Sequence, residues 1–355
     1  MFALSKSRSE NTGEYQTMNP YNPPFTLSPA ILRLVEEIGE ALGRLRQVEA
    51  GAVSPQLRRE NRIRTIQGSL AIEGNTLALE QVSDILDGKH VIGSPREIQE
   101  VRNAISAYEK IGDWLPTSRN HILEAHRTMM SGLMDNPGSF RMGSVGIRKG
   151  DVVVHVAPKS NLVPALMDNL LSWLVKTDHH PLVAGCVFHY ELEFIHPFAD
   201  GNGRMGRLWQ TSILCRWKPV FAYLPLESVV RDRQQDYYKA LGQADKAADA
   251  TVFIEFMLTA LRDACLQVAN SDQASDYVSD QVRAVLRVLL STEMTATKLM
   301  KSLDLSHRPT FRKNYLRPAL DAGWIEMTNP QSPRSPAQRY RITGSGRIKT
   351  ISSTE

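Results

Sequence analysis

The chain has 355 residues and a formal net charge of +4, and 42% of its residues are hydrophobic and 23% charged. This length exceeds one average domain, so we expect two or three compact units in a chain with the composition of a soluble protein. No run of about 18 apolar residues is present, which argues against a membrane-spanning helix. The N-terminus lacks a secretory signal, and Cys186, Cys215 and Cys265 show no metal spacing, so we expect free thiols and a cytoplasmic protein.

The chain then reads as mainly helical. Residues 1–28 are polar and contain several prolines, which predicts an irregular arm packed across the body. From Ser28, a capping residue followed by Pro29, apolar residues recur at helical spacing. Further helices are expected over 55–72, 79–86, 95–114, 118–130, 163–175, 181–194, 204–217, 231–241 and 251–269. The segment 144–156 departs from this pattern and predicts two short strands around Lys149-Gly150-Asp151, a hairpin signal.

The last part of the chain has a different organisation. Residues 270–275 are polar and predict a linker, followed by helices over 279–290, 296–303 and 308–322 and two strands near Trp324 and Tyr340. Three helices and a two-stranded wing are typical of a winged helix-turn-helix. Residues 276–355 carry 13 Lys+Arg and 7 Asp+Glu, or +6, against −2 elsewhere. This balance suits DNA backbone contact, although protein docking and a structural lid are alternatives.

The segment Asp200-Gly-Asn-Gly-Arg204 joins two expected helices and has the features of an anion site. Glycines leave the backbone N–H groups accessible, and a helix N-terminus adds partial positive charge, which suits phosphates. Arg204 and Arg207 are three residues apart, so both guanidinium groups can reach one polyphosphate. Asp200 suits Mg2+, and His196 can accept a proton from a hydroxyl. The alternative is a polar helix cap beside a structural histidine.

The segment from His196 to Arg207, HPFADGNGRMGR, resembles the signature of the Fic (Fido-fold) family, H-x-F-x-D/E-G-N-G-R-x-x-R, at all eight specified positions. The wider resemblance covers residues 115–265 and implies a helical fold with one β-hairpin. It implies that His196 is the general base that activates a Ser, Thr or Tyr hydroxyl for attack on the α-phosphorus of ATP, with pyrophosphate leaving. Phe198 would anchor the loop in the core.

The resemblance also implies how ATP is held. Asp200 would bind Mg2+, Asn202 and the loop N–H groups would hold the α- and β-phosphates, Arg204 would pair near the β-phosphate, and Arg207 would pair with the γ-phosphate. The nucleotide site would thus consist of Asp200, Gly201, Asn202, Gly203, Arg204, Met205, Gly206 and Arg207. Tyr237 and Asp245 resemble the adenine and ribose side, although asparagine is more familiar at the position of Asp245. Tyr237 is equally explained as a core aromatic.

Fic proteins place a hairpin flap over the site, where it aligns the target segment by strand addition. In this chain Val152, Val153, Val154 and His155 would form that edge. The alternative is a surface hairpin without this role.

A second segment, Ser69-Leu-Ala-Ile-Glu-Gly-Asn75, places Ser69 and Glu73 on one helix face just before the helix stop at Gly74. It resembles the inhibitory motif of the Fic family, S/T-x-x-x-E-G/N. The resemblance implies that Glu73 pairs with Arg207 and displaces the γ-phosphate, as in self-inhibited members with an N-terminal inhibitory helix. The alternative is an ordinary surface glutamate at a helix end.

We therefore expect a mainly α protein, a Fic helical core with a β-hairpin flap and a C-terminal winged helix-turn-helix. The expected units are residues 1–114 with the inhibitory motif, 115–269 as the catalytic domain and 276–350 as the winged helix. The expected function is transfer of AMP from ATP to hydroxyls of an unknown protein target and of the chain itself, with Mg2+ as cofactor. Alternatives are an ATP-sensing DNA-binding regulator, transfer of another phosphate-containing group, and AMP removal. Family members often dimerise, so a homodimer is an alternative to a monomer.

Overall fold

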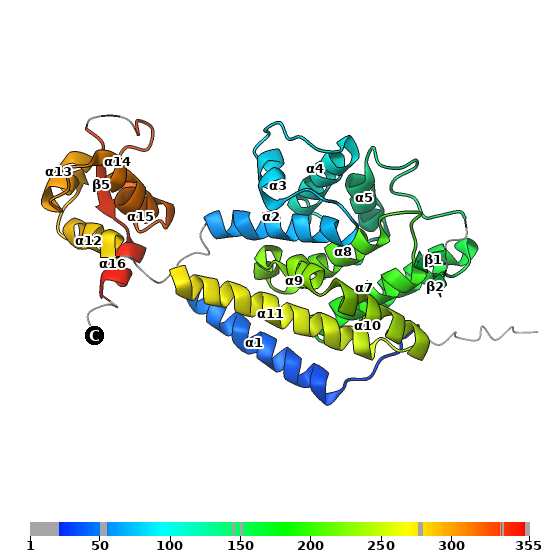
Figure 1. The fold of residues 1–355 in the computed structure, drawn as a ribbon. Coiled ribbons are helices and arrows are strands. Elements are labelled where there is room, and N and C mark those ends of the chain that lie inside the picture. The colour runs from blue at the N-terminus through cyan, green and yellow to red at the C-terminus, as the bar shows by residue number, and fades with distance from the viewer. Residues whose placement is uncertain are drawn as a thin grey trace, which may run out of the picture.

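The computed structural model describes residues 21–49, 55–143, 146–149, 152–275, 280–333, 335 and 337–351. Helices dominate these residues, and two small antiparallel sheets accompany them (Figure 1). None of the helices in this described part has the length and apolar content that crossing a bilayer requires. Residues 1–20 of the expected arm, Gly150 and Asp151 at the hairpin turn, and 276–279 lie outside the described residues.

The larger body of the molecule is built from helices around one hydrophobic cluster. Its helices are α1 (Pro29–Glu49), α2 (Pro55–Ile72), α3 (Leu79–Leu86), α4 (Pro95–Glu109), α5 (Arg119–Met130), α6 (Val163–Lys176), α7 (Pro181–Ile195), α8 (Asn202–Trp217), α9 (Leu226–Asp232), α10 (Gln234–Ala247) and α11 (Thr251–Ser275), with short 3-10 turns η1 (Ser160–Leu162) and η2 (Pro219–Tyr223). The long helices α1 and α11 lie side by side on one flank, and α2 to α5 lie on the other (Figure 1). The paired helices α7 and α8 run between these two flanks.

Helix α7 forms the centre of this body because apolar residues surround it on all sides. Twelve of its fifteen residues are buried, including His189 and Glu191. A helix that is apolar all round must be enclosed by other elements, since no face of it suits water. This burial fixes the position of the helix end from which the glycine-rich loop starts.

The boundaries predicted from the sequence agree with the structure for α2 and α3, differ by one or two residues for several other helices, and differ most at three places. Helix α4 ends at Glu109 rather than at residue 114, because the chain turns there and brings Trp114 into the core beside Trp209, with ring centroids 6.4 Å apart. The helix expected over 231–241 is two helices, α9 and α10, which meet at Arg233. The expected linker 270–275 is wrong, since α11 remains helical as far as Ser275.

The described part of the arm packs on the body as expected. The N–H of Ala250 donates to the carbonyl of Pro24 at 2.8 Å, and the hydroxyl of Tyr21 donates to Glu191 of α7. The N–H of Ile31 donates to the hydroxyl of Ser28 at 3.2 Å, so the predicted cap of α1 is confirmed.

The expected hairpin is present as β1 (Gly146–Lys149) and β2 (Val152–Val156), which pair in antiparallel register with a bulge between Ile147 and Arg148. These two strands form a sheet of their own, and β2 lies against α10. Among the described strands, none pairs with the outer edge of β2, so that edge can accept another strand.

Residues 280–351 pack around a second hydrophobic cluster that includes Val285, Leu299, Phe311 and Tyr340. Its elements are α12 (Asp280–Leu289), β3 (Met294–Thr295), α13 (Ala296–Ser302), α14 (Arg308–Phe311), the π-helical turn η3 (Arg312–Leu316), α15 (Arg317–Asp321), β4 (Ile325–Met327), β5 (Arg339–Ile342) and α16 (Gly344–Ile351). The predicted order of three helices and two wing strands is found, with α14, η3 and α15 forming the third helix. Two elements were not predicted: the two-residue strand β3, which pairs with β5, and the final helix α16.

Candidate functional site

The glycine-rich segment forms a tight loop between the end of α7 and the start of α8. Two residues of the loop have a left-handed backbone, His196 with φ 49° and Gly201 with φ 84°. At Gly201 a Cβ atom would lie 2.7 Å from the sulfur of Met130, so glycine is required by both its φ and its neighbour. For His196, a residue with a side chain, this conformation carries a cost that surrounding contacts must offset.

The amide of Asn202 closes the loop on itself. Its Oδ1 accepts from the N–H of Phe198 and its Nδ2 donates to the carbonyl of Phe198, each at 2.9 Å. Phe198 is fully buried, which places it in the core as the family resemblance implies. Because the Asn202 side chain is used in this way, the backbone N–H at the start of α8 is the Asn202 group that remains for the predicted phosphate contact.

A buried histidine of α5 packs against the loop and bonds to its backbone. His126 stacks on Phe198 with ring centroids 3.8 Å apart. The N–H of Gly138 donates to His126 Nδ1 at 2.8 Å, so the proton is on Nε2, which donates to the carbonyl of Asp200 at 3.0 Å. Burial lowers the pKa of His126 to about 4, so the ring is neutral near pH 7. No spacing pattern in the sequence singles out this residue.

Asp200 and Arg204 lie in a cluster of charges at one side of the loop. Arg204 is 3% exposed and donates to Asp200 Oδ1 at 3.1 Å, and its Nη1 lies 3.7 Å from Glu100 Oε1. Arg96 Nη2 lies 3.6 Å from Asp200 Oδ2. Glu100 and Arg96 belong to α4 and were not predicted, because nothing in the sequence indicates that α4 approaches the loop.

The Asp200 carboxylate has the character expected of a magnesium ligand. Its side chain is 48% exposed, which leaves it accessible from the mouth of the loop. Within the described part of the chain, no group of three or more His, Cys, Asp or Glu residues forms a cage for a metal ion. A single accessible carboxylate fits Mg2+ when phosphate oxygens and water supply the other ligands.

Arg207 is held by both residues of the predicted inhibitory motif. The guanidinium is 1% exposed, and its Nη2 lies 2.7 Å from Glu73 Oε1 and 3.0 Å from the carbonyl of Ser69. Its Nε donates to the hydroxyl of Ser69 at 3.2 Å. Burial alone would lower the pKa of Arg207, but the Glu73 carboxylate raises it above its ordinary value. Ser69 therefore binds Arg207 directly rather than only ending its own helix.

The Glu73 carboxylate also lies over the N-terminus of α8. A Cβ placed on Gly203 would be 2.5 Å from Glu73 Oε1 and 3.1 Å from Arg207 Nη1. The first N–H groups of a helix have no intrahelical partner and attract anions. Glu73 thus lies beside the helix N-terminus where a phosphate is predicted from the sequence.

The position of Glu73 is fixed by the way α2 ends. Gly74 has φ 93°, and the chain reverses so that the N–H of Asn75 donates to the carbonyl of Leu70 at 3.1 Å. Gln234 and Tyr238 of α10 donate to the carbonyl of Ile72 at 2.8 and 3.3 Å. These hydrogen bonds give partners to the last carbonyls of α2, and they hold the chain so that Glu73 lies against Arg207.

The structure places Tyr237 in the core, as the alternative expectation has it. It is 1% exposed, and its hydroxyl lies 3.2 Å from His189 Nε2 and 3.4 Å from Glu193 Oε1. Burial raises its pKa well above the ordinary value. Asp245, also expected at the nucleotide, is half-buried and accepts from the hydroxyl of Tyr190 at 3.1 Å. A nucleotide contact by either residue stays a prediction.

The last two residues expected at the nucleotide face inward. Met205 is fully buried, and its N–H donates to the carbonyl of Gly201 at 2.9 Å within the first turn of α8. At Gly206 a Cβ would lie 2.5 Å from Cδ2 of His189, so glycine lets α8 approach α7 closely. The histidine ring beneath is neutral, since burial lowers the pKa of His189 to about 3.

For the expected flap edge, Val152, Val153 and His155 lie on β2, opposite Lys149, Arg148 and Ile147 of β1, and Val154 lies between them. Their side chains lie outside the described part of the structure, and the role of this edge stays a prediction.

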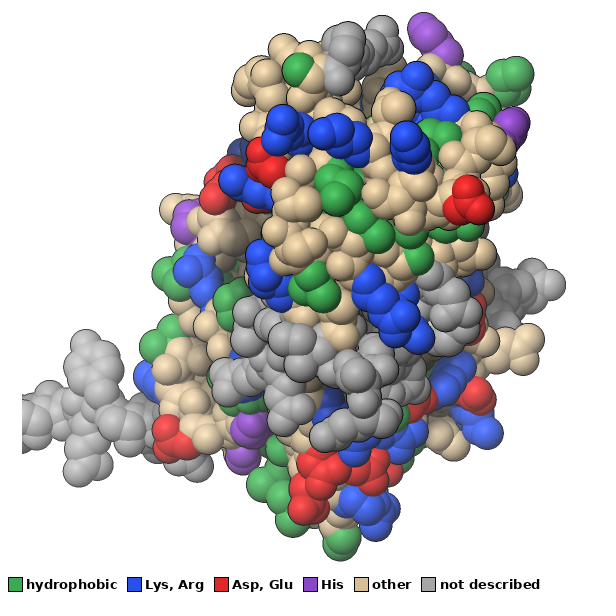
Figure 2. All heavy atoms as spheres, turned by 90° about the vertical axis from the view of Figure 1, so that its left-hand side faces the viewer, with side chains coloured by type: hydrophobic (Ala, Val, Ile, Leu, Met, Phe, Trp, Pro, Cys, Tyr) green, Lys and Arg blue, Asp and Glu red, His purple; other side chains and the backbone are tan. Residues whose placement is uncertain are grey.

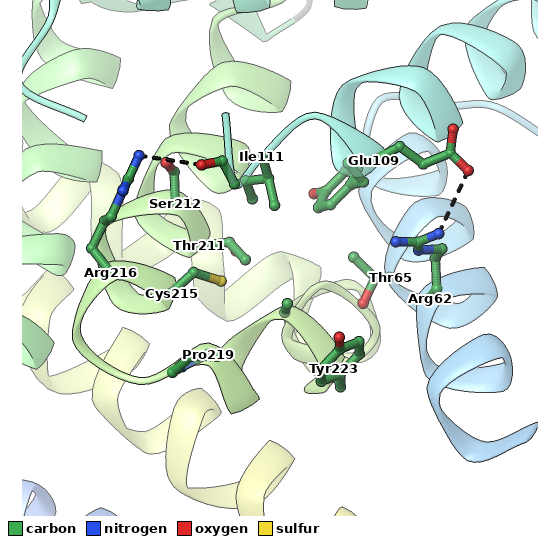
Figure 3. Close-up of a pocket in the computed structure, with 13 residues that line it drawn as sticks. Arg62, Thr65, Glu109, Ile111, Thr211, Ser212, Cys215, Arg216, Pro219 and Tyr223 are labelled. Atoms are coloured by element: carbon green, nitrogen blue, oxygen red, sulfur yellow. Dashed lines mark hydrogen bonds and ion pairs between the residues drawn. The ribbon is translucent and has the colours of Figure 1, made fainter. Parts of the chain in front are cut away.

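A separate cavity of about 350 Å³ is lined by residues of α2, α4, α8 and η2 (Figure 3). Its lining includes Thr65 of α2, Thr211 of α8 and Tyr223 of η2. Thr65 lies one helical turn before Ser69, and Thr211 lies one turn after Arg207. No residue from His196 to Arg207 lines it, so it is distinct from the candidate site.

Comparison with known proteins agrees with this geometry. Residues 116–214 match the model of the Fic/DOC family, and residues 280–343 match that of the C-terminal domain of "Filamentation induced by cAMP protein Fic-like". A solved Fic family protein from Desulfovibrio desulfuricans G20 is 58% identical, with a TM-score of 0.70, and the match covers 91% of this chain and 99% of that one.

Two curated relatives carry the name protein adenylyltransferase Fic. The one from Nematostella vectensis is 30% identical over 63% of this chain and 53% of its own length, and the one from Drosophila grimshawi is 29% identical over 72% and 52%. The chain thus spans about half the length of these curated relatives. Because the Desulfovibrio desulfuricans protein matches over nearly its whole length, this chain belongs to the Fic family.

Proposed function

We propose that the chain is a protein adenylyltransferase that transfers AMP from ATP to a protein hydroxyl and that Glu73 inhibits it. The observation that carries the proposal is the Glu73 carboxylate at the N-terminus of α8, 2.7 Å from Arg207 Nη2. A position that holds one carboxylate against a buried arginine and free helix N–H groups has the charge to bind a phosphate instead.

The proposed reaction uses residues that the loop brings to one mouth. His196 accepts the proton of a Ser, Thr or Tyr hydroxyl, and the oxygen attacks the α-phosphorus of ATP. A new bond joins this oxygen to the α-phosphorus, while the bond from the α-phosphorus to the oxygen bridging to the β-phosphate breaks, so pyrophosphate leaves with that electron pair. The N–H groups of Asn202 and Gly203 would stabilise the phosphate charge, and Arg204 would pair near the β-phosphate.

Mg2+ would be held by Asp200 together with phosphate oxygens and would neutralise part of the phosphate charge. Arg204, which bonds to Asp200 at 3.1 Å, would orient that carboxylate. The geometry of the helix N-terminus and the two arginines is the protein's own contribution to phosphate binding.

In the proposed inhibition, Glu73 competes with the γ-phosphate for Arg207. A hydrogen bond between charged groups contributes about 1.5–3 kcal/mol, which is about 10- to 100-fold in the availability of Arg207. Glu73→Gly should therefore raise the rate of self-modification with labelled ATP by about that factor. Glu80→Gly on the exposed start of α3 is the matched control and should leave the rate unchanged. Unchanged or lower incorporation in Glu73→Gly would overturn the inhibition.

The role of His196 and the identity of the transferred group are tested in the Glu73→Gly protein. His196→Ala should abolish transfer while ATP still binds, because the phosphate-binding groups lie in the following loop and helix. Mass spectrometry should show the gain of one AMP on the modified protein. A phosphate or UMP gain would point to another donor, loss of AMP from a modified protein would point to the reverse reaction, and ATP binding without any transfer would favour a sensor.

A second candidate function is DNA binding by residues 280–351. Arg308, Arg312 and Lys313 of the α14–α15 helix are exposed, and among the described residues none of them forms an ion pair with a carboxylate, whereas Arg317 lies 3.6 Å from Asp321. Figure 2 looks onto this side of the molecule and shows many basic and few acidic side chains on the part that these residues form. Basic side chains without internal partners are available for phosphates.

A gel shift with the full chain and duplex DNA at low salt tests this candidate. We expect binding that weakens with salt, and Arg308→Ala with Arg312→Ala should reduce the salt slope by about 2. The matched double variant removes Arg287 and Arg347, which lie on α12 and α16. An equal loss of DNA affinity in both double variants would indicate that binding depends on net charge alone. If the full chain shifts no DNA at low salt, protein docking or a structural lid remains as the role of residues 280–351.

A further inference from the structure

Arg141, which follows α5 and precedes the hairpin, is buried in an unusual environment. It is 5% exposed, and within the part of the chain that the structure describes its side chain donates four hydrogen bonds, each to a backbone carbonyl. Among the described residues no carboxylate pairs with it, and burial lowers its pKa. A buried cation without a counter-ion is costly unless dipoles of the backbone are arranged to stabilise it.

Two of the carbonyls belong to the end of α7, next to the proposed base. Arg141 Nε donates to the carbonyl of His196 at 2.7 Å, and Nη2 lies 3.4 Å from the carbonyl of Ile195. The backbone N–H of Arg141 donates to the carbonyl of Pro197 at 2.9 Å. The last carbonyls of a helix lack partners and carry partial negative charge, so the guanidinium caps α7 where His196 takes its left-handed φ of 49°.

The other two carbonyls belong to the two stems of the hairpin. Arg141 Nη1 donates to the carbonyl of Gly143 at 2.8 Å, before β1, and Nη2 donates to the carbonyl of Pro158 at 2.5 Å, after β2. The hydroxyl of Ser160 adds a bond across the stems, to the carbonyl of Met142 at 2.7 Å. One planar guanidinium therefore joins both ends of the hairpin to the backbone of the proposed base.

We propose that Arg141 is a positioning residue that sets the hairpin against His196, so that a target strand on β2 presents its hydroxyl to the base. This inference rests on the proposed transferase function and adds a residue on the acceptor side of the site. The ATP side is formed by Asp200 to Arg207 and does not contact Arg141. Loss of Arg141 should therefore slow transfer and leave ATP binding unchanged.

The kinetic test uses the full chain with Glu73→Gly as the active parent. In Arg141→Gln the self-modification rate at saturating ATP should fall at least about tenfold, since small misplacements of reacting groups carry such costs, while the KM for ATP stays constant. Arg141→Lys keeps the charge but not the planar fork, so it should restore thermal stability more than rate. Ser160→Ala should lower the rate in the same direction by a smaller factor.

The matched control is Arg216→Gln. Arg216 also donates to two backbone carbonyls, those of Gly112 and Trp114, but at the far end of α8. This variant should keep the parent rate. A folded Arg141→Gln protein with the parent rate, or a rate loss explained by a higher KM for ATP, would overturn the proposal.

A second measurement does not depend on activity. Hydrogen exchange of the amides of residues 143–158 and of His196 should be at least about tenfold faster in Arg141→Gln than in the parent, with exchange in α8 unchanged, because the lost bonds join these two segments only. Equal exchange in both proteins would exclude the positioning role. If the parent transfers nothing, the proposed function fails, and this measurement still decides whether Arg141 fixes the hairpin.

Discussion

At the scale of single residues, Glu227 is a buried acid that Thr211 links to Arg207. Glu227 of α9 is 1% exposed, and its carboxylate accepts from the hydroxyl of Tyr108 at 2.8 Å and from that of Thr211 at 3.4 Å. Thr211 also bonds to the carbonyl of Arg207 at 3.1 Å. Burial raises the pKa of Glu227 to about 7, so its charge changes near physiological pH.

This pKa implies a pH-dependent stability. The folded protein binds the proton of Glu227 more tightly than the unfolded chain, so the stabilisation is complete below about pH 4.5 and is lost as the pH rises through 7. The difference in the pKa of Glu227 between the folded and the unfolded chain corresponds to about 3 kcal/mol in the free energy of unfolding. Urea unfolding from pH 4 to pH 9 should show the stability advantage of the native protein over Glu227→Gln shrinking by about that amount. Parallel curves, as expected for the exposed control Glu80→Gln, would contradict this.

At the scale of elements, α2 carries Ser69, ends just before the proposed inhibitory residue Glu73, and is fixed by its contact with α9. A Cβ placed on Gly68 would lie 2.7 Å from the backbone C of Glu227 and 2.7 Å from the N of Ser228. Backbone atoms cannot rotate away as a side chain can. The two helices α2 and α9 therefore pack so closely here that only a glycine fits at residue 68. The residue next to this contact is Ser69, which binds Arg207.

Gly68→Ala should therefore move α2 and weaken the hold on Arg207. Overpacking of this kind costs about 1–3 kcal/mol, and we expect a lower midpoint of thermal unfolding together with faster self-modification in otherwise native protein. Gly43→Ala in α1, where the added Cβ meets nothing within 4 Å, is the control and should be neutral or stabilising. Lower stability without any gain in rate would show that the position of α2 does not limit the reaction.

At the scale of the whole molecule, the described residues form two separate hydrophobic clusters, one from Ile31 to Ala269 and one from Val282 to Ile342. Separate cores predict separate cooperative units. Scanning calorimetry of the full chain should show two unfolding transitions. One of the two should also be seen in a fragment of residues 276–355. A single transition in the full chain and an unfolded fragment would contradict this division.

The sequence by itself predicted the helices around the loop, and it is also the source of the chemistry proposed for the loop. Helix α2 and the capping by Ser28 follow from local spacing and local hydrogen bonds, which depend on neighbouring residues alone. The segment from His196 to Arg207, for which phosphate binding is proposed, is contiguous, so its glycines, arginines and histidine could be interpreted together. Helix breaks that serve packing, as at Trp114, could not be predicted, because they depend on a partner far along the chain.

Tertiary structure alone decided which groups surround that loop. His126 beneath Asp200, Glu100 beside Arg204 and Arg141 against His196 come from segments 55 or more residues away in the sequence. Each is an ordinary polar residue in its own helix or turn. Its role appears only in the folded protein, where burial removes water and the remaining partners are backbone carbonyls or one charged side chain. Sequence patterns record local geometry and chemistry, whereas these contacts depend on how the helices pack, which no local pattern encodes.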